Sequence, residues 1–150
     1  MEKEPKTVPF KLQNIVTEQF ATIKSAYQEG EKIRLSSSVG FSINPSEKSV
    51  AVNTQFEFDQ EKRVFLLIEV ACHFAIESKA WQQMLSDDGT QLNVPQGLAL
   101  HLAVITVGTT RGVLHAKTEK TMFNQFILPT VNLSEIIKEN PVLDLKHEQP

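Results

Sequence analysis

The residues best suited to chemistry are four histidines and one cysteine, and their spacing does not assemble a metal site. The histidines stand at positions 73, 101, 115 and 147, and the cysteine is Cys72. The sequence has no His-Glu-x-x-His pair, no second cysteine, and no carboxylate at a helical spacing that would complete a zinc site. We therefore expect no metal and no cofactor, and we interpret the histidines as partly buried or interface side chains.

Patterns for a nucleophile or a phosphate site are also missing. Serines 36 to 38 lie in an alternating, strand-like run without the Gly-x-Ser-x-Gly elbow that exposes a catalytic serine. Cys72 falls inside an apolar run, which favours a buried thiol. The glycine-rich stretch from Gly108 to Gly112 belongs to an expected helix, and Lys120-Thr121 lacks the preceding glycine of a P-loop. The sequence predicts no catalytic residue, so we expect a protein that is not an enzyme.

Length and charge describe one mildly acidic domain spanning 1–150. The chain has 15 Lys and Arg against 18 Asp and Glu, for a net charge of -3. The basic residues are scattered along the chain, which argues against nucleic acid as a partner. We find no apolar leader and no apolar run long enough to cross a bilayer, so we expect a cytoplasmic protein without membrane insertion. The polar ends, 1–8 and 141–150, are expected to be flexible.

Four segments have the alternation of strands and predict an antiparallel sheet. In the stretch 10–23 the apolar residues stand at even positions in some places and at odd positions in others, which indicates a strand with a bulge or bend. The stretches 33–43 and 50–58 alternate cleanly on either side of the turn Asn44-Pro45-Ser46-Glu47, as in a hairpin with one wet face. The fourth strand, 64–77, is apolar on one row and only partly polar on the other, so something is expected to cover part of its second face. We expect the four strands in meander order.

A long helix is expected after the sheet. It begins at Pro95, a residue suited to the first helical turn, and runs to about Ala116, with a bend or early end at Gly108 as an alternative. Its apolar residues fall on two faces, and a chain of this size has little left to cover the second. A neighbouring subunit is the economical partner for that face. The predicted oligomer interface consists of Leu100, Val104 and Val107.

Shorter elements flank the long helix. The stretch 79–94 contains apolar residues followed by Asp87-Asp88-Gly89, which indicates a short amphipathic piece and a turn. The stretch 117–130 has mixed character. Asn132 and Glu135 form a box-like pair that predicts a short C-terminal helix, which Pro141 ends. The predicted fold class is therefore α+β, with a four-stranded antiparallel sheet followed by a long and a short helix.

The sequence contains more apolar and aromatic side chains than one small core requires, and such a surplus favours a binding protein. Two stretches, 33–43 and 123–128, carry apolar residues without an evident partner and suggest a groove for other polypeptides. Unfolded chains expose apolar side chains every few residues, so a long groove could hold many of them weakly. The candidate client-binding residues are Val39, Phe41, Val52, Phe56, Phe123, Phe126 and Ile136.

Four segments in order resemble the SecB family of protein-export chaperones over nearly the whole chain. Phe10-Lys-Leu-Gln-Asn-Ile15 is similar to the family's first strand and Phe65-Leu-Leu-Ile-Glu-Val70 to its fourth. Ile105-Thr106 through Arg111-Gly112 resembles the end of its long helix, and Pro129-Thr-Val-Asn-Leu133 the entry into its last helix. The family pattern that opens the long helix is reduced here to Val94-Pro95 and the apolar residues that follow.

The resemblance implies a homotetramer, built as a dimer of dimers, that keeps unfolded or preprotein chains export-competent in apolar grooves and hands them to the SecA motor. Leu67 and Glu69 match family positions that face SecA, and Glu77 is expected on the same wet face, whereas an acidic family position on the first strand is Gln19 here. Two alternatives stay open. One is a SecB-like chaperone dedicated to a single client, such as an antitoxin. The other is a small-ligand or lipid-binding domain whose sheet and helix enclose a pocket.

Overall fold

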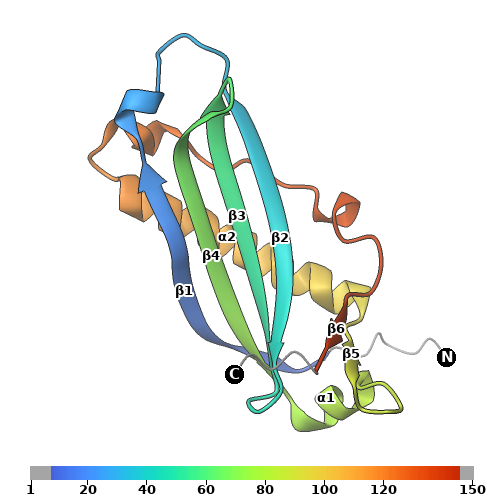
Figure 1. Cartoon of the computed structure of the whole chain (residues 1–150). Helices are drawn as coiled ribbons and strands as arrows, with labels where there is room; N and C mark the ends of the chain where they lie inside the picture. The colour runs from blue at the N-terminus through green and yellow to red at the C-terminus, as the bar shows by residue number, and fades with distance from the viewer. Residues whose placement is uncertain (1–7, 146–150) are drawn as a thin grey trace, which may run out of the picture.

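A four-stranded antiparallel sheet forms the centre of the computed structural model, which describes residues 8–145 (Figure 1). The strands are β1 (Phe10–Thr22), β2 (Arg34–Asn44), β3 (Ser49–Gln60) and β4 (Arg63–Ile76). This confirms the expected fold class. Across the sheet the order is β1-β4-β3-β2, so the expected meander order is wrong for β1. β4 is the most apolar strand on both of its rows, and pairing with β1 gives it a neighbour on each side.

Irregular pairing explains the changing parity of β1. Its register with β4 shifts between Leu12 and Asn14 and again between Thr17 and Gln19. Each extra residue moves the following side chains to the other face, which confirms the expected bulge. The hairpin is confirmed as well, because β2 and β3 pair in unbroken register from Arg34 opposite Asp59 onward.

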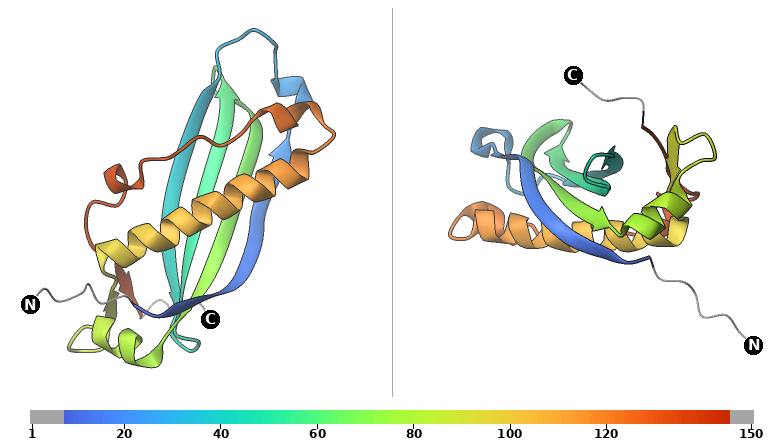
Figure 2. Two further views of the ribbon diagram at one scale, coloured as in Figure 1. Left: turned by 180° about the vertical axis from the view of Figure 1, so that it is seen from behind. Right: turned by 90° about the horizontal axis from the view of Figure 1, so that it is seen from below.

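The long helix, α2 (Gln96–Thr118), crosses one face of the sheet diagonally (Figures 1 and 2). Pro95 immediately precedes it, and the helix continues through Gly108 and Gly112 without ending. By length and composition α2 is apolar enough to cross a bilayer, contrary to the expectation that no such stretch exists. Here it packs on the sheet with Leu102 and Ala103 fully buried, as the core helix of a globular protein does.

Smaller elements complete the chain. They are η1 (Lys24–Ala26), α1 (Ser78–Met84), β5 (Gln91–Asn93), η2 (Met122–Gln125), η3 (Leu133–Glu135) and β6 (Val142–Asp144).

Two expectations about the C-terminal end need correction. The short C-terminal helix is only the single 3-10 turn η3, because the Asn132 side chain accepts from Ser134 Oγ at 2.6 Å and makes no capping bond to the backbone. The expected loose tail is ordered up to Leu145, since β6 pairs with β5. The expectations for 1–7 and 146–150 lie outside the described residues.

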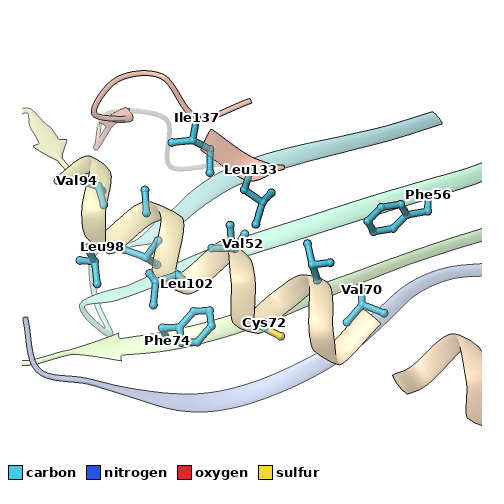
Figure 3. Close-up of a cluster of buried hydrophobic side chains, with 14 of the residues drawn as sticks. Val52, Phe56, Val70, Cys72, Phe74, Val94, Leu98, Leu102, Leu133 and Ile137 are labelled. Atoms are coloured by element: carbon cyan, nitrogen blue, oxygen red, sulfur yellow. The ribbon is translucent and has the colours of Figure 1, made fainter. Parts of the chain in front are cut away.

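The core fills the space between the sheet and α2 (Figure 3). Alternate residues of β3 and β4 point to the helix, and Val52, Val70 and Phe74 are all 0% exposed. Leu133 and Ile137, from the chain after α2, enter the same cluster. The segment after α2 also contacts the helix through η2 and η3, whereas sequence reasoning assigned the second apolar side of the helix to a neighbouring subunit.

Candidate binding groove

The candidate site is formed by the segment 127–141, here called the strap, together with the free edge of the sheet. After α2 and η2 the strap runs back across the sheet to the β2 side and leads into β6 (Figure 2). Leu128, Leu133 and Ile137 anchor it, with exposed fractions of 2%, 5% and 5%. Ile127, just before the first anchor, and Ile136, between the second and the third, are exposed. The strap is therefore fixed at intervals and leaves apolar side chains accessible.

A groove of about 600 Å³ lies between β2 and the end of the strap. It is lined by Val39, Phe41, Ile136, Ile137, Lys138, Glu139, Asn140, Pro141 and Val142. Three of the predicted client-binding residues, Val39, Phe41 and Ile136, thus come together here from distant parts of the sequence. Ile136 is 44% exposed and Val142 is 55% exposed, while Val39 and Phe41 are half-buried. The groove combines an apolar lining with charged residues, Lys138 and Glu139.

The position of β2 explains why the groove is open. β2 pairs with β3 on one side and is an edge strand on the other. α2 packs on β3 and β4, so the inward side chains of β2 depend on the strap for cover. An edge strand also presents backbone N–H and C=O groups that can pair with another chain. The groove therefore offers both apolar contacts and a strand edge.

The other four predicted client-binding residues lie elsewhere. Val52 and Phe56 face α2 from β3 and are 0% and 1% exposed, and Phe123 in η2 is 5% exposed. These three predictions are wrong, because a side chain enclosed by its own core has no surface for a client. Phe126 is half-buried, with its ring centroid 5.1 Å from that of Phe65. It belongs to an aromatic cluster at the opposite end of the sheet from β5 and β6.

Sequence reasoning missed the groove residues from 137 to 142, because the stretch up to Pro141 was assigned to a short helix and the chain after it was expected to be loose. A weak signal was present. Val142, Leu143 and Leu145 are apolar residues in an otherwise polar tail, and Leu143 pairs with Leu92 of β5. A short strand buried on one side by a distant partner is difficult to recognise from the local sequence.

The outer face of the sheet carries two of the three predicted SecA-facing residues. Leu67 and Glu69 are half-buried on β4, and no helix of the described residues lies over this face (Figure 1). Asn53 Nδ2 donates to Glu69 Oε2 at 2.8 Å. Glu77 follows the last residue of β4 and occupies the N-cap position of α1, where its backbone amide donates to the carbonyl oxygen of Pro9 at 3.1 Å. Its place on the SecA-facing surface stays a prediction.

The predicted oligomer interface is divided by the fold. Val104 is 58% exposed on α2, and Leu100 is half-buried. Val107 is 5% exposed and belongs to the chain's own core, so its assignment to an interface is wrong. The reason is that α2 packs on β3 and β4, and Val107 lies in the core cluster that they share.

Within residues 8–145 no group of three or more His, Cys, Asp or Glu side chains is placed to hold a metal. Cys72 is fully buried. The clearest electrostatic perturbation is at Asp88, in the loop before β5, where side-chain hydrogen bonds from Ser86 and Thr90 lower the pKa of the carboxyl from 3.8 to about 2. Asp88 is solvated, so its bonds shape a turn. The geometry of the groove supports binding as the function of the site.

No family model matches the sequence, and no curated protein matches it either. Among solved structures the fold is similar to a SecB-like chaperone of Mycobacterium tuberculosis, solved in complex with a ChAD peptide from the HigA1 antitoxin. The TM-score is 0.51 with 13% sequence identity, over 82% of this chain and 90% of that one. The chain has a SecB-like fold. At this identity the likeness shows the fold alone, and the groove must support the function.

Proposed function

We propose that this protein is a chaperone that binds unfolded polypeptide in the groove between β2 and the strap. The observation that carries the proposal is the meeting of Val39, Phe41 and Ile136 beside a free strand edge. The SecB-like fold supports it, since a chaperone of this fold was solved with a peptide of another protein. The space between the sheet and α2 is filled by core side chains, which favours this reading over a ligand-binding domain.

Strand addition is the binding mode that fits the groove. An extended client can pair its backbone with the free edge of β2, so that alternate side chains enter the groove. Backbone pairing is independent of sequence, and each buried apolar side chain adds roughly 1.5 to 3 kcal/mol. The expected client is therefore an extended segment with apolar residues at alternate positions.

Assembly is the second part of the proposal. Val104 and Leu100 support a homotetramer, built as a dimer of dimers, because they leave apolar surface on α2. Several grooves on one assembly would raise the affinity for a long client through avidity. Light scattering at micromolar concentration tests this part, and a monomer there contradicts it.

Client range and delivery form the third part. In the broader version the protein works in the cytoplasm, keeps preproteins export-competent and passes them to SecA through the face bearing Leu67 and Glu69. In the narrower version it serves one client, and the antitoxin peptide in the similar structure favours this version. Binding to the SecA of the same organism separates the two, because the dedicated chaperone is expected to show none.

The groove itself is tested with Phe41→Ser. We expect the variant to hold an unfolded client at least about tenfold more weakly, because one buried ring contributes roughly 1.5 to 3 kcal/mol. Ile33→Ser is the matched control, since Ile33 is an exposed apolar residue just before β2 that does not line the groove. The measurement is suppression of aggregation of a slowly refolding client, with circular dichroism as a check of the fold. Equal losses in the two variants would place client binding outside the groove.

A further inference from the structure

Arg111 of α2 holds the beginning of the strap through its backbone. Its Nε donates to the carbonyl oxygen of Leu128 at 2.7 Å, and Nη2 donates to that of Pro129 at 2.8 Å. Among the described residues Arg111 forms no ion pair with a carboxylate. The planar guanidinium thus directs two donors at consecutive carbonyl groups, which sets the direction of the chain there.

The strap has few other bonds that would set its path. Among residues 8–145, no backbone amide from 127 to 131 donates to another backbone group, and Pro129 has no amide hydrogen. Leu128 supplies a buried apolar anchor at this point, but such contacts are non-directional. The Arg111 bonds therefore fix the direction of the strap backbone at a place where it has no regular backbone hydrogen bonds.

Gln96, in the first turn of α2, holds the other end of the strap. Its side-chain Nε2 donates to the carbonyl oxygen of Ile137 at 2.9 Å, and its backbone amide donates to Asn140 Oδ1 at 2.8 Å. Ile137 and Asn140 both line the groove, whereas Gln96 and Arg111 do not. Gln96 is thus bonded to two residues that line the groove without lining it itself.

We propose that Gln96 and Arg111 are positioning residues for client binding, which hold the strap at the distance from β2 that the groove requires. The inference rests on the proposed function and adds residues that touch no client. Loss of either side chain leaves Leu128, Leu133 and Ile137 buried, so the strap stays attached but moves more freely. A wall that moves more freely must be ordered when the client binds, and this cost lowers affinity.

The test compares Gln96→Met and Arg111→Met with Lys117→Met. Lys117 is an exposed cation on the same helix, with its Nζ over the Phe20 ring, so this control repeats the charge change of Arg111→Met away from the strap. The probe is a fluorescein-labelled peptide of alternating Phe and Ser with Lys at each end. We expect roughly three- to tenfold weaker binding for both strap variants, mainly through faster dissociation, and binding within twofold of wild type for the control.

Amide exchange and a conservative variant separate positioning from a general loss of fold. In the client-free protein, Gln96→Met is expected to speed exchange near Ile137 while the amides of β3 and β4 keep their wild-type protection. Arg111→Lys keeps one donor and is expected to bind with intermediate affinity. If Arg111→Met and Gln96→Met bind like wild type, the positioning role is overturned and the groove proposal stands. If the wild-type protein binds no peptide, the groove proposal falls, and the positioning role falls with it.

Discussion

The two ends of the sheet use apolar residues in opposite ways. At one end, rings from four segments enclose one another, with Phe65 at 5.1 Å from Tyr27 and 6.4 Å from Phe123 between ring centroids. At the other end, the side chains of Val39 and Phe41 meet the strap across an open groove. The closed end contributes stability, and the open end retains surface for binding. Sequence reasoning assigned Phe56 and Phe123 to client binding, and the fold encloses both of them.

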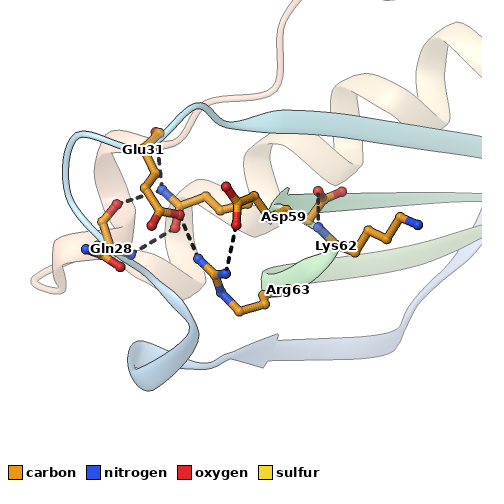
Figure 4. Close-up of polar contacts among 7 residues, drawn as sticks. Gln28, Glu31, Asp59, Lys62 and Arg63 are labelled. Atoms are coloured by element: carbon orange, nitrogen blue, oxygen red, sulfur yellow. Dashed lines mark hydrogen bonds and ion pairs between the residues drawn. The ribbon is translucent and has the colours of Figure 1, made fainter.

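A polar network holds the closed end (Figure 4). Gln60, fully buried at the end of β3, accepts from the amide of Gln28 and donates to its carbonyl oxygen, each at 2.8 Å. Arg63 bonds Glu31 at 2.6 Å, and Asp59 accepts from the amide of Lys62. The Gln60 and Arg63 bonds attach the crossover between β1 and β2 to the β3–β4 hairpin, and the Asp59 bond closes the turn of that hairpin. The strap has fewer such bonds along its length, which is why its attachments to α2, by Arg111 at its beginning and by Gln96 at its end, matter.

The largest expected effect is at the closed end. Phe65→Ala removes a ring at the centre of the aromatic cluster and is expected to lower the free energy of unfolding by about 3 to 5 kcal/mol. Phe41→Ala, at the open end, is expected to cost about 1 to 2 kcal/mol, because its ring is only half-buried. Urea unfolding followed by Trp81 fluorescence measures both, since Trp81 is buried in α1. Equal losses would remove the distinction between the two ends.

A smaller effect is expected from Gln60→Leu. The variant leaves the Gln28 amide and carbonyl without their buried partner, which is expected to cost about 1 to 3 kcal/mol. Hydrogen exchange should become faster in the crossover 24–33, while client binding by folded protein stays within twofold of wild type. A matching loss of client affinity would show that the two ends are coupled.

The smallest effect is the pH response of the loop before β5. The folded pKa of Asp88, about 2, lies below its ordinary value of 3.8 because Ser86 and Thr90 donate to the ionised carboxylate. The stabilisation is therefore fully present above about pH 4 and is lost as the pH falls through 2. An NMR titration of the Asp88 carboxyl carbon is expected to give a midpoint near 2. A midpoint near 3.8 would mean that the loop bonds do not form in solution.

Local sequence patterns predicted most of the helices and strands, but they did not predict which side chains of each element are buried. Alternation in β2 and β3 predicted the hairpin, and the changing parity of β1 predicted its bulges. The burial of Phe65 was not predictable from alternation, because a register shift after Phe58 lets it share the core with its neighbour Leu66. Val104 and Val107 lie on the same helix, yet Val104 is exposed and Val107 belongs to the core, because α2 buries one side against the rest of the chain.

The amino-acid sequence alone determined the four long strands and the long helix, because each depends on residue type and short-range spacing. The tertiary structure decided which apolar residues are core and which form the groove. Val39 and Val52 are both strand valines, yet α2 covers Val52 and leaves Val39 to the strap. Burial depends on contacts between residues far apart in the chain, so the groove exists only once β2 and the strap have come together.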